Sequence, residues 1–368
     1  MNTIEFDDLG PARLVQLYDP QTGLRAMVVV DNIALGIAIG GVRISPSVSL
    51  QEVARLARTM TMKSAIAGLD HGGGKAGIIA DPKQQNIEQL VRAFARMMQG
   101  VEDYVPAPDM GSDERMMVWI KEEIGRVLGL PEEIGGLPLD KLGATGYGLA
   151  ECAEIACQHL KTPLQNARVA IQGFGSVGRA AARFLVEKGA IIVAVSDTSG
   201  TLTDPQGLEI DKLIAHKLTN EEIRDAGQGE YLVRDAVFAS DCDILIPAAT
   251  PDVINASNMH QVKARLILEG ANIPITREAE DTLTRKGVRI VPDFIANAGG
   301  LIMAAMEYRQ KSAEEAFVAI TRKIQKNTEQ ILRKAQKEDI LPRAAAEQLA
   351  LERVKAAMTV RNLSYPWK

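Results

Sequence analysis

The segment Ala167–Gly175, ARVAIQGFG, constrains the fold of this 368-residue chain more than any other part of the sequence. This apolar run ends in glycines and continues into the amphipathic stretch SVGRAAARFLVEKG, which ends at Gly189. The run predicts a buried strand, and the stretch predicts a helix. A second apolar run, Ala190–Asp197, follows directly and predicts another strand. Strands that alternate with helices in this way indicate a parallel sheet with helices on both faces.

The turn between the first strand and the helix has the spacing G-x-G-x-x-G, which is typical of dinucleotide-binding sites. In such a turn the first glycine permits a tight bend, the second lets the backbone approach a pyrophosphate, and the third lets the helix pack close to the strand. The alternative is a tight strand–helix turn that binds no ligand. The context favours the dinucleotide site, and its predicted residues are Gly173, Gly175, Ser176, Val177 and Gly178.

The choice between the two common dinucleotides depends on Asp197, which ends the second predicted strand. A carboxylate at this place can accept a hydrogen bond from the ribose 2′-hydroxyl, and it would repel a 2′-phosphate. The segment that follows, SDTSGTLTDPQG, contains no arginine to hold such a phosphate. The sequence therefore predicts NAD rather than NADP as the cofactor.

The remaining sequence divides into two regions. Further strands of the same sheet are expected at Ile244–Pro247, Leu266–Leu268 and Val288–Val291. In the N-terminal region, apolar patterns predict strands at Met27–Val30 and Ile78–Ala80 and helices at Leu50–Met62 and Ile87–Met98. Glycine and proline cluster at 131–140, so we place the domain boundary there, with domains at 1–135 and 136–334. The helical C-terminal region, 335–368, is expected to pack back on the first domain.

Composition and charge exclude several classes of protein. The net charge of -5 argues against a nucleic-acid surface, which is usually basic. No apolar run is long enough to span a membrane, and the N-terminus lacks the pattern of a signal peptide, so we expect a cytoplasmic protein. The three cysteines, Cys152, Cys157 and Cys242, are not spaced as metal ligands. We therefore expect buried thiols and no metal site.

The segment MTMKSAIAGLDHGGGKAGIIADP contains two lysines, Lys63 and Lys75. It is not a P-loop, because Ala76 stands where that motif requires serine or threonine. One interpretation is that the glycines hold Lys75 in a tight cleft, where burial and a nearby cation would lower its pKa and suit it to carbonyl chemistry. Lys63 could then hold a substrate carboxylate. The alternative, two solvated surface lysines, remains open from this segment alone.

Taken together, these segments resemble the glutamate/leucine/phenylalanine/valine dehydrogenases over about residues 25–310. The matching segments occur in family order: LGIAIGGVRISP (35–46), the lysine segment (60–82), YVPAPDMGS (104–112), GATGYG (143–148), IQGFGSVG, DCDILIPAA (241–249), EGAN (269–272) and VPDFIANAGG (291–300). The resemblance implies an α/β enzyme with an N-terminal substrate-binding and oligomerisation domain and a Rossmann-type NAD-binding domain. Its reaction would convert an L-amino acid reversibly to the 2-oxo acid and ammonia, and the chain would form a homo-oligomer.

The resemblance also implies roles for individual residues of the first domain. Lys75 is similar to the catalytic lysine of the family, and Asp109 is similar to its general acid/base. Lys63 is similar to the residue that binds the substrate α-carboxylate, beside the backbone of Gly40 and Gly41. Without the resemblance, Asp109 reads as a turn or helix-cap aspartate after a proline.

Five residues of the second domain resemble positions around the cofactor. Thr145 and Asn272 resemble positions near the nicotinamide end, and Ala248 and Ala249 would line the cofactor cleft. Asn297 resembles a residue that sits between the substrate and the nicotinamide. On its own, Asn297 reads as a helix-cap or turn amide.

The substrate side chain can be inferred from two substitutions within the motifs. Family members that act on glutamate carry a lysine where this chain has Ile39, and they tend to carry a serine where it has Ala304. A γ-carboxylate against these apolar residues would be desolvated and unpaired. The predicted side-chain pocket is Ile39, Ala107, Leu301 and Ala304, closest to that of leucine dehydrogenase. It suits leucine, valine or isoleucine, and Ala304 also leaves room for an aromatic side chain.

Two alternatives remain. The segments VPAPDMGS and GATGYG look more like the glutamate-type members, so the chain could be a glutamate dehydrogenase in which another cation, such as Arg43, holds the γ-carboxylate. It could also be a non-catalytic subunit that regulates a partner. The presence of Lys63, Lys75 and Asp109 together argues against that second alternative.

Overall fold

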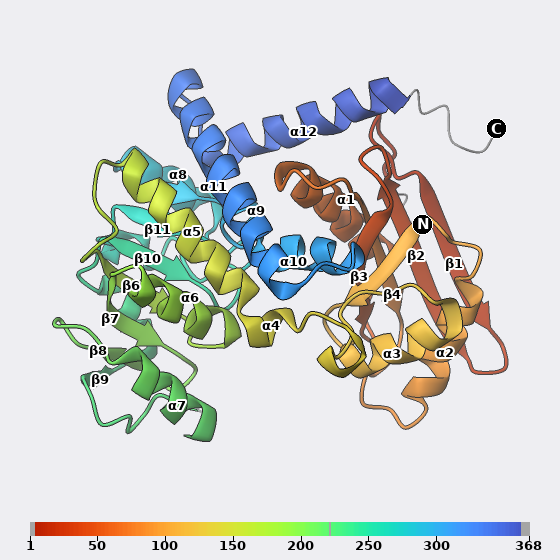
Figure 1. Ribbon diagram of the computed structural model, residues 1–368, viewed down its shortest axis with the longest axis horizontal. Helices are drawn as coiled ribbons and strands as arrows, with labels where there is room; N and C mark the ends of the chain where they lie inside the picture. Colours follow the sequence, from red (N-terminus) through yellow and green to blue (C-terminus); the bar gives the residue numbers. More distant parts are fainter. Residues whose placement is uncertain (1–3, 221, 362–368) are drawn as a thin grey trace. The chain divides into compact units, whose positions relative to one another are not determined.

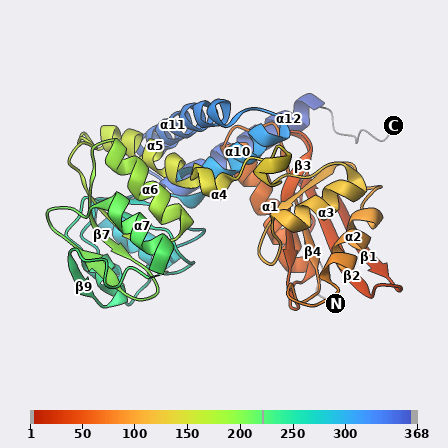
Figure 2. The ribbon, with the colours of Figure 1, turned by 60° about the horizontal axis from the view of Figure 1, so that its bottom comes forward.

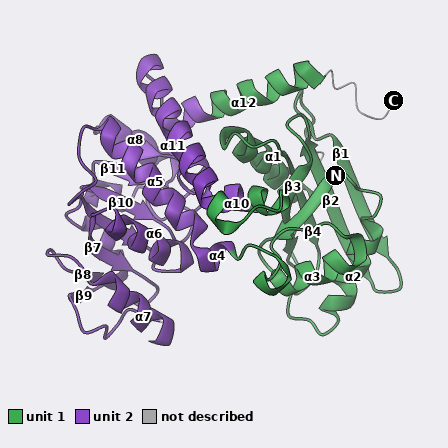
Figure 3. Cartoon of the chain, in the orientation of Figure 1, with its two compact units in different colours: residues 1–138, 304–316, 347–368 green, residues 139–303, 317–346 purple. Residues whose placement is uncertain are grey.

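The computed structural model describes residues 4–220 and 222–361 and divides into two compact units (Figure 1, Figure 3). Unit 1 contains the chain up to Pro138, residues 304–316 and the chain from Glu347 onward. Unit 2 contains residues 139–303 and 317–346. From the sequence we expect the boundary after residue 135 and the return of the chain at 335. The structure puts the boundary three residues later and the final return at Glu347, and it adds 304–316 to unit 1.

Unit 1 is built on a five-stranded sheet of order β1-β2-β4-β3-β5. β1 and β2 are antiparallel to their neighbours, whereas β3 runs parallel to both β4 and β5. The strands are β1 (Arg13–Asp19), β2 (Leu24–Asn32), β3 (Ala38–Ile44), β4 (Gly72–Ile78) and β5 (Tyr104–Pro108), and the helices are α1 (Leu50–Ile66), α2 (Ile87–Met97) and α3 (Glu114–Ile124).

Both faces of this sheet are covered, which explains the continuous apolar run in β2. Met27 and Val29 join a cluster with residues of α1, while Val28 and Val30 join a larger cluster with residues of α2 and α3. Alternate residues of a strand point to opposite faces, so a strand between two helical layers needs apolar residues throughout. Figure 1 and Figure 2 both show α2 and α3 side by side. The predicted strand at Met27–Val30 is confirmed.

The predicted strand at Ile78–Ala80 is wrong, because the strand lies earlier and contains the glycine run GGGKAGI. Glycine has a low strand propensity, so the sequence of this run does not indicate a strand. Packing requires the glycines here. A Cβ on Gly73 would lie 2.1 Å from the backbone nitrogen of Thr61 in α1, and one on Gly74 would lie 2.6 Å from the Tyr104 ring.

Unit 2 contains a seven-stranded sheet of order β12-β11-β10-β6-β7-β8-β9. The first five of these strands are parallel, as the sequence predicts, but β8 and β9 extend the sheet as antiparallel strands. The strands are β6 (Arg168–Gln172), β7 (Ile191–Ser196), β8 (Thr201–Thr203), β9 (Glu230–Leu232), β10 (Ile244–Pro247), β11 (Leu266–Leu268) and β12 (Arg289–Val291).

The strand order of unit 2 defines where a ligand can bind. From β6 the chain proceeds to β7 on one side and later to β10 on the other, so the direction of the connections changes between β6 and β10. In open α/β sheets, ligands bind at such a point, outside the carboxyl ends of the strands. The remaining helices labelled in Figure 1 are α4 (Leu139–Leu142), α5 (Ala144–His159), α6 (Ser176–Glu187), α7 (Ile210–Asn220), α8 (Arg277–Arg285), α9 (Asp293–Ala296), α10 (Gly299–Tyr308), α11 (Ala313–Glu338) and α12 (Pro342–Arg361).

Two expectations from composition can be compared with this fold. The three cysteines are buried, as predicted, and burial raises the pKa of the thiols of Cys152 and Cys242 to about 12 and that of Cys157 to about 11. These thiols are therefore protonated and unreactive at neutral pH. Within residues 4–220 and 222–361, no helix combines the length and apolar character needed to cross a membrane.

Candidate active site

An ion pair between Lys75 and Asp109 is the centre of the candidate site in unit 1. Lys75 Nζ lies 3.0 Å from Asp109 Oδ2. Lys75 belongs to β4 and Asp109 follows the last residue of β5, so the two residues reach across the intervening strand β3. A Cβ on Gly41 of β3 would lie 2.5 Å from the Cβ of Asp109 and 3.1 Å from Lys75 Nζ. The missing side chain of Gly41 therefore leaves the space in which the pair meets.

Two further charged residues continue this ion pair into a chain. Arg43 Nε donates to Asp109 Oδ2 at 2.9 Å, and Arg43 Nη1 donates to Glu52 Oε1 at 2.6 Å. Arg43 lies in β3 and Glu52 in the first turn of α1. The resulting order of charges is Lys75, Asp109, Arg43 and Glu52, with cation and anion alternating. Sequence analysis named Arg43 only as a candidate partner for a substrate carboxylate, and it missed Glu52.

Burial sets the ionisation of this group. Lys75 is 6% exposed, so it is not one of the solvated surface lysines that the sequence left open. Burial lowers the pKa of Lys75, as does the nearby Arg43, and together they outweigh the opposite effect of Asp109. Burial alone would raise the pKa of Asp109, but the ammonium of Lys75 and the guanidinium of Arg43 bring it below its usual value. Asp109 is thus a carboxylate at neutral pH, beside a lysine that loses its proton more easily than usual.

The other predicted substrate-binding residues of unit 1 lie on the same elements. Gly40 and Gly41 occupy the middle of β3, where the buried hydroxyl of Tyr104 donates to both of their carbonyl oxygens, at 2.6 and 3.2 Å. A Cβ on Gly40 would lie 1.7 Å from the carbonyl oxygen of Gly74, so the strands could not approach as they do. Lys63 lies in the last turn of α1 and is half-buried.

Three of the four residues predicted to form the side-chain pocket are gathered in one apolar cluster. Ile39 is buried in this cluster, and Ala107 and Ala304 pack against it. The fourth, Leu301, lies one turn before Ala304 in α10, in the part of that helix assigned to unit 2. The sequence analysis missed two buried members, Val105 and Leu128. Val105 could have been found from the alternation of β5, which gives Val105 and Ala107 one common face.

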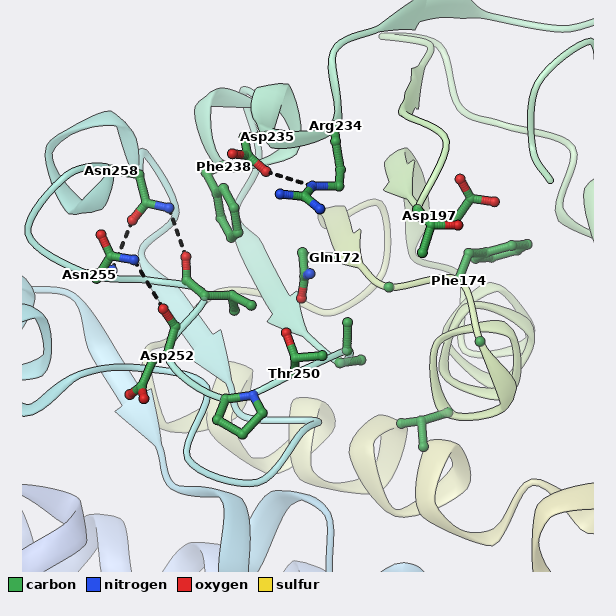
Figure 4. A pocket seen from close by; sticks show the side chains of 18 of the residues that line it. Gln172, Phe174, Asp197, Arg234, Asp235, Phe238, Thr250, Asp252, Asn255 and Asn258 are labelled. Carbon is green, nitrogen blue, oxygen red and sulfur yellow. Dashed lines mark hydrogen bonds and ion pairs between the residues drawn. The ribbon is translucent and has the colours of Figure 1, made fainter. Parts of the chain in front are cut away.

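Unit 2 contains a pocket of about 740 Å³ at the carboxyl end of β6, the place that the strand order indicates (Figure 4). Gln172 and Thr250 lie near its centre, with Asp197 on one side and Asn255 on the other. The lining includes these residues predicted to bind the cofactor: Gly173, Gly175, Ser176, Val177, Asp197, Ala248 and Ala249.

The three glycines of the turn have the geometry that a dinucleotide requires. Gly173 has φ +95°, and a Cβ there would lie 2.7 Å from the Cβ of Ala249. A Cβ on Gly178 would lie 1.9 Å from the carbonyl oxygen of Gly173, so this glycine lets α6 start against the strand. Gly175 has no atom within 4 Å of an added Cβ, which leaves open space for a phosphate to approach the backbone. The residues present therefore fit a dinucleotide at the N-terminus of α6.

Asp197 is engaged in a way that the sequence analysis did not anticipate. Its Oδ2 lies 2.6 Å from the Nζ of Lys217 in α7, and its Oδ1 accepts from the Ser199 hydroxyl at 2.6 Å. Burial raises the pKa of Asp197, but Lys217 and Ser199 lower it further, so the net shift is downward. Lys217 and Arg234 also line the pocket, although both come from beyond the segment searched for a phosphate-binding cation.

The residues that line this pocket do not include Asn297, which follows α9, Asn272, or Thr145 in the first turn of α5. The side-chain nitrogen of Asn297 lies 3.3 Å from Asn272 Oδ1 and also from the carbonyl oxygen of Ala271. Thr145 packs at the start of α10, where a Cβ on Gly300 would lie 2.9 Å from its hydroxyl oxygen. Among the residues that the structure describes, no group of three or more His, Cys, Asp or Glu side chains could hold a metal ion.

Comparison with known proteins agrees with this geometry. Two family models match: Glutamate/Leucine/Phenylalanine/Valine dehydrogenase over residues 135–362, and the Glu/Leu/Phe/Val dehydrogenase dimerisation domain over residues 11–126. The chain belongs to this dehydrogenase family. It is therefore an amino-acid dehydrogenase, an oxidoreductase that acts on a CH–NH2 group, and the family resemblance of its sequence is confirmed.

Individual relatives of this family align with the chain over most of its length. A glutamate dehydrogenase of Aeropyrum pernix is 37% identical over 356 residues, covering 90% of this chain and 85% of the relative. An NAD-specific glutamate dehydrogenase of Staphylococcus aureus is 35% identical, covering 93% and 86%. The structure of a hetero-hexameric glutamate dehydrogenase of Thermus thermophilus in a leucine-bound form superposes with a TM-score of 0.82 at 31% identity, covering 97% and 91%. The predicted α/β fold with two domains is confirmed.

Proposed function

We propose that this protein catalyses the NAD-dependent, reversible oxidative deamination of an apolar L-amino acid of the leucine, valine or isoleucine type. One observation carries the proposal: the Lys75–Asp109 pair and the apolar cluster lie on one face of β3. Ile39 and Gly41 are two residues apart, so they share that face, and two residues of a strand span about 7 Å. An amino acid whose amino group lies at the ion pair can therefore reach the cluster with an aliphatic side chain.

The residues of unit 1 would divide the chemistry between them. Lys63 would bind the α-carboxylate of the substrate. Asp109, a carboxylate at neutral pH, would carry protons to and from the substrate nitrogen. Lys75 would stabilise the charge that develops when water adds to the imine carbon, and its lowered pKa would let it take the proton of that water. NAD, when bound, supplies the acceptor for the hydride that leaves the Cα atom.

In unit 2, the N-terminus of α6 and the open backbone at Gly175 would hold the pyrophosphate of NAD. Asp197 would accept a hydrogen bond from the adenosine ribose, and Ala248 and Ala249 would line the cleft. The fit of the pocket to a dinucleotide and the NAD-specific relative in Staphylococcus aureus both support this assignment.

A second candidate is glutamate as the substrate, because the relatives described above are named glutamate dehydrogenases. Against it, the cluster that would receive the side chain consists of two isoleucines (Ile37 and Ile39), Val105, Leu128 and two alanines. Arg43, the cation suggested as a substitute anchor, already donates to two carboxylates, Asp109 and Glu52. A γ-carboxylate would therefore lack a partner and pay the cost of desolvation.

The proposal is tested by turnover of the purified chain with NAD and a panel of L-amino acids, followed through the absorbance of NADH. We expect leucine, valine or isoleucine to exceed glutamate in kcat/KM by at least about tenfold, since one buried unpaired charge costs more than 1.4 kcal/mol. If glutamate is the best substrate, the pocket argument is wrong although the mechanism stands.

We also propose that the chain forms a homo-oligomer through the dimerisation domain. Turnover of the purified chain without a partner, together with light scattering, tests this assembly. The Thermus thermophilus enzyme is described as a hetero-hexamer, which makes the activity of this chain by itself informative. We expect full turnover without a partner chain, together with one oligomeric species in light scattering. A chain that is folded but inactive until a second polypeptide is added would favour a regulatory subunit.

A further inference from the structure

We propose that Arg43 and Glu52 are positioning residues: Glu52 holds Arg43, and Arg43 holds the carboxylate of Asp109 in the orientation that faces Lys75. The inference rests on the proposed function, because that function assigns Lys75 and Asp109 to the chemical step. Neither Arg43 nor Glu52 belongs to the residues that the proposed mechanism uses.

The positions of the two residues follow from the elements that carry them. Ile39, Gly41 and Arg43 are alternate residues of β3 and share one face, so the empty position of Gly41 lies between the apolar cluster and the guanidinium. α1 covers this face, since a Cβ on Gly77, the β4 partner of Arg43, would meet the side chain of Val53. The first turn of α1 thereby brings Glu52 to Arg43.

The backbone N–H groups of Glu52 and Asp109 are both held by serine hydroxyls. The Glu52 N–H donates to Ser49 Oγ at 3.2 Å, which caps α1 and fixes its first turn. The Asp109 N–H donates to Ser112 Oγ at 2.9 Å, and that hydroxyl donates to the carbonyl oxygen of Val42 at 2.7 Å. The backbone of Asp109 is thus held by Ser112, and the orientation of its carboxylate is left to its two cationic partners.

Those two partners differ in one property that matters during a reaction. Lys75 can lose its proton, and in the proposed chemistry it must be neutral before it takes a proton from water. Arg43 keeps its charge at every pH in the working range. When Lys75 is neutral, Arg43 is the partner that still holds the carboxylate by a charged hydrogen bond. Glu52, 2.6 Å from Arg43 Nη1, keeps the guanidinium in place through its second donor.

The four charges also influence one another. Besides each other, Lys75 responds to Arg43 from β3 and Glu52 from α1, Asp109 responds to Arg43, and Tyr104 of β5 responds to Asp109. Arg43 lowers the pKa of both Lys75 and Asp109, whereas Glu52 raises the pKa of Lys75. Tyr104 is fully buried and its pKa is raised well above the usual value, so it stays neutral. Removing the guanidinium of Arg43 and removing the carboxylate of Glu52 must therefore move the pKa of Lys75, and with it the pH dependence of turnover, in opposite directions.

The test compares Arg43→Met, Arg43→Lys and Glu52→Gln with the unsubstituted protein and with Arg92→Met as a matched control. Arg92 also bridges carboxylates in unit 1, through Glu88 and Glu122 on α2 and α3, away from the site. For each variant, kcat and KM for the best amino acid are measured across pH, and circular dichroism with urea unfolding reports the fold. The rate of Lys75 acylation by acetic anhydride, read by peptide mass spectrometry, gives the apparent pKa of this lysine without turnover.

We expect Arg43→Met to lower kcat by about 100-fold, the scale of one acid–base group, with KM changed by less than about threefold. Its pH profile and the acylation pKa of Lys75 should move to higher pH. Glu52→Gln should move both to lower pH and lower kcat by about tenfold, and Arg43→Lys should keep the wild-type pH profile while losing part of kcat. The control should match the unsubstituted protein.

Two outcomes would overturn the inference: an Arg43→Met variant as active as Arg92→Met, or Arg43→Met and Glu52→Gln variants whose pH shifts have the same sign. If Arg43→Met does not fold, Arg43→Lys and Glu52→Gln carry the comparison. If the unsubstituted protein turns over no amino acid, the proposed function fails. The positioning role is then decided by the acylation pKa of Lys75. Shifts of this pKa in opposite directions in the Arg43 and Glu52 variants support the role, and a pKa equal to that of the unsubstituted protein contradicts it.

Discussion

Ile39 is an apolar member of the cluster in unit 1, at the position where glutamate-specific members of the family carry a lysine. It is 3% exposed and packs with Val105 and Leu128. Any substrate side chain that enters this cluster exchanges water for hydrocarbon, which favours an aliphatic group by about 0.8 kcal/mol for each CH2 buried. If the proposed function is correct, a carboxylate in the same place would find no cation among the described members of the cluster, and discrimination between the two classes of substrate would depend on this.

The first prediction follows by adding that cation. We expect Ile39→Lys to raise the kcat/KM ratio of glutamate to leucine by about 100-fold or more, since the ammonium would pair with the γ-carboxylate. Steady-state kinetics with both amino acids measure this ratio. Ile39→Met is the control, because it conserves volume and polarity and should leave the ratio unchanged. An unaltered ratio in the lysine variant would place the side-chain pocket elsewhere.

The second prediction concerns Lys217, whose ammonium lies 2.6 Å from Asp197 Oδ2. Without it, the carboxylate of Asp197 would keep its full charge toward the pocket and repel a 2′-phosphate more strongly. We therefore expect Lys217→Met to lower the kcat/KM for NADP relative to NAD by about tenfold, or about 1.4 kcal/mol. Lys212→Met, on the exposed part of α7, should have no such effect. A relative gain in NADP use would show that Lys217 does not neutralise Asp197.

These residues also show how far the sequence alone could describe the site. Lys75 and Asp109 could be named from motifs, but the contact of Asp109 with Arg43 could not. The contact depends on the strand order β4-β3-β5, which no local pattern encodes. Lys217 was missed for a similar reason, because α7 returns to Asp197 from a position 20 residues later in the chain.

At the scale of an element, the turn between β6 and α6 separates two roles of glycine. Gly178 is required by packing, since a Cβ there would lie 1.9 Å from the Gly173 carbonyl oxygen. Gly175 has φ -82° and ψ -159°, which any residue adopts, and open space around its Cα. Glycine would be required at position 175 only because the ligand approaches the backbone there.

The third prediction compares these two glycines. We expect Gly178→Ala to destabilise the protein by about 3 kcal/mol or more, because the strand and the helix must separate. Gly175→Ala should change stability by less than about 0.5 kcal/mol and raise the KM for NAD by about tenfold, because its methyl group enters the space of the pyrophosphate. Urea unfolding and NAD titration distinguish the two. Equal stability of both variants would contradict the packing argument.

The first turn of α12 is held by Arg343, which reaches three carboxylates of unit 2. Its guanidinium lies 2.6 Å from Glu269, 2.9 Å from Glu280 and 3.4 Å from Asp293. All three carboxylates are buried, so each depends on this cation. Such a cluster of charges contributes little to the net free energy of unfolding when it is intact. Removal of one partner nevertheless destabilises the protein strongly, because the remaining charges stay buried without a partner.

The fourth prediction is that Arg343→Met destabilises the protein by about 3–5 kcal/mol, because it leaves several buried carboxylates without a cation. The midpoint of urea unfolding at constant protein concentration measures this change. Arg333→Met, on the exposed side of α11, is the matched control and should change stability by less than about 0.5 kcal/mol. A small effect at Arg343 would mean that the carboxylates become protonated at little cost.

Elements were predictable from the sequence where burial alone decides them. The strands at Ile244–Pro247 and Leu266–Leu268 have the bounds that their apolar runs predict. β4 was misplaced because its glycines suit a strand only when α1 and Tyr104 press against it. β8 and β9 were not predicted either, since short strands at a sheet edge carry a weak pattern.

For the molecule as a whole, the two units have separate apolar cores, and the chain passes between the units more than once. The sequence analysis expected one return at 335, where helix follows helix without a change in composition. The structure divides α10, α11 and α12 internally, at Ala304, Phe317 and Glu347. A unit boundary inside a helix is not marked by glycine, proline or a polar segment in the sequence. It can be recognised only from the packing of the two ends of that helix in the structure.

The fifth prediction is a pH dependence of stability that originates at Glu269, which is fully buried. Burial raises its pKa from the usual 4.5 to about 7, against the attraction of Arg343. The folded state then binds the proton more tightly than the unfolded state does. The contribution of Glu269 to the free energy of unfolding is complete below about pH 4.5 and is lost as the pH rises to about 7. The loss is on the order of 3 kcal/mol, from 1.36 kcal/mol for each unit.

The measurement is urea unfolding of the unsubstituted protein and of Glu269→Gln between pH 4.5 and 8, at one protein concentration because an oligomer's stability depends on it. The glutamine cannot ionise, so its variant lacks this one titration and keeps all the others. The difference in free energy of unfolding between the two proteins should therefore change by about 3 kcal/mol across that range, with the unsubstituted protein losing ground as the pH rises. Parallel curves would mean that Arg343 keeps Glu269 ionised throughout, and that the guanidinium outweighs burial in the centre of unit 2.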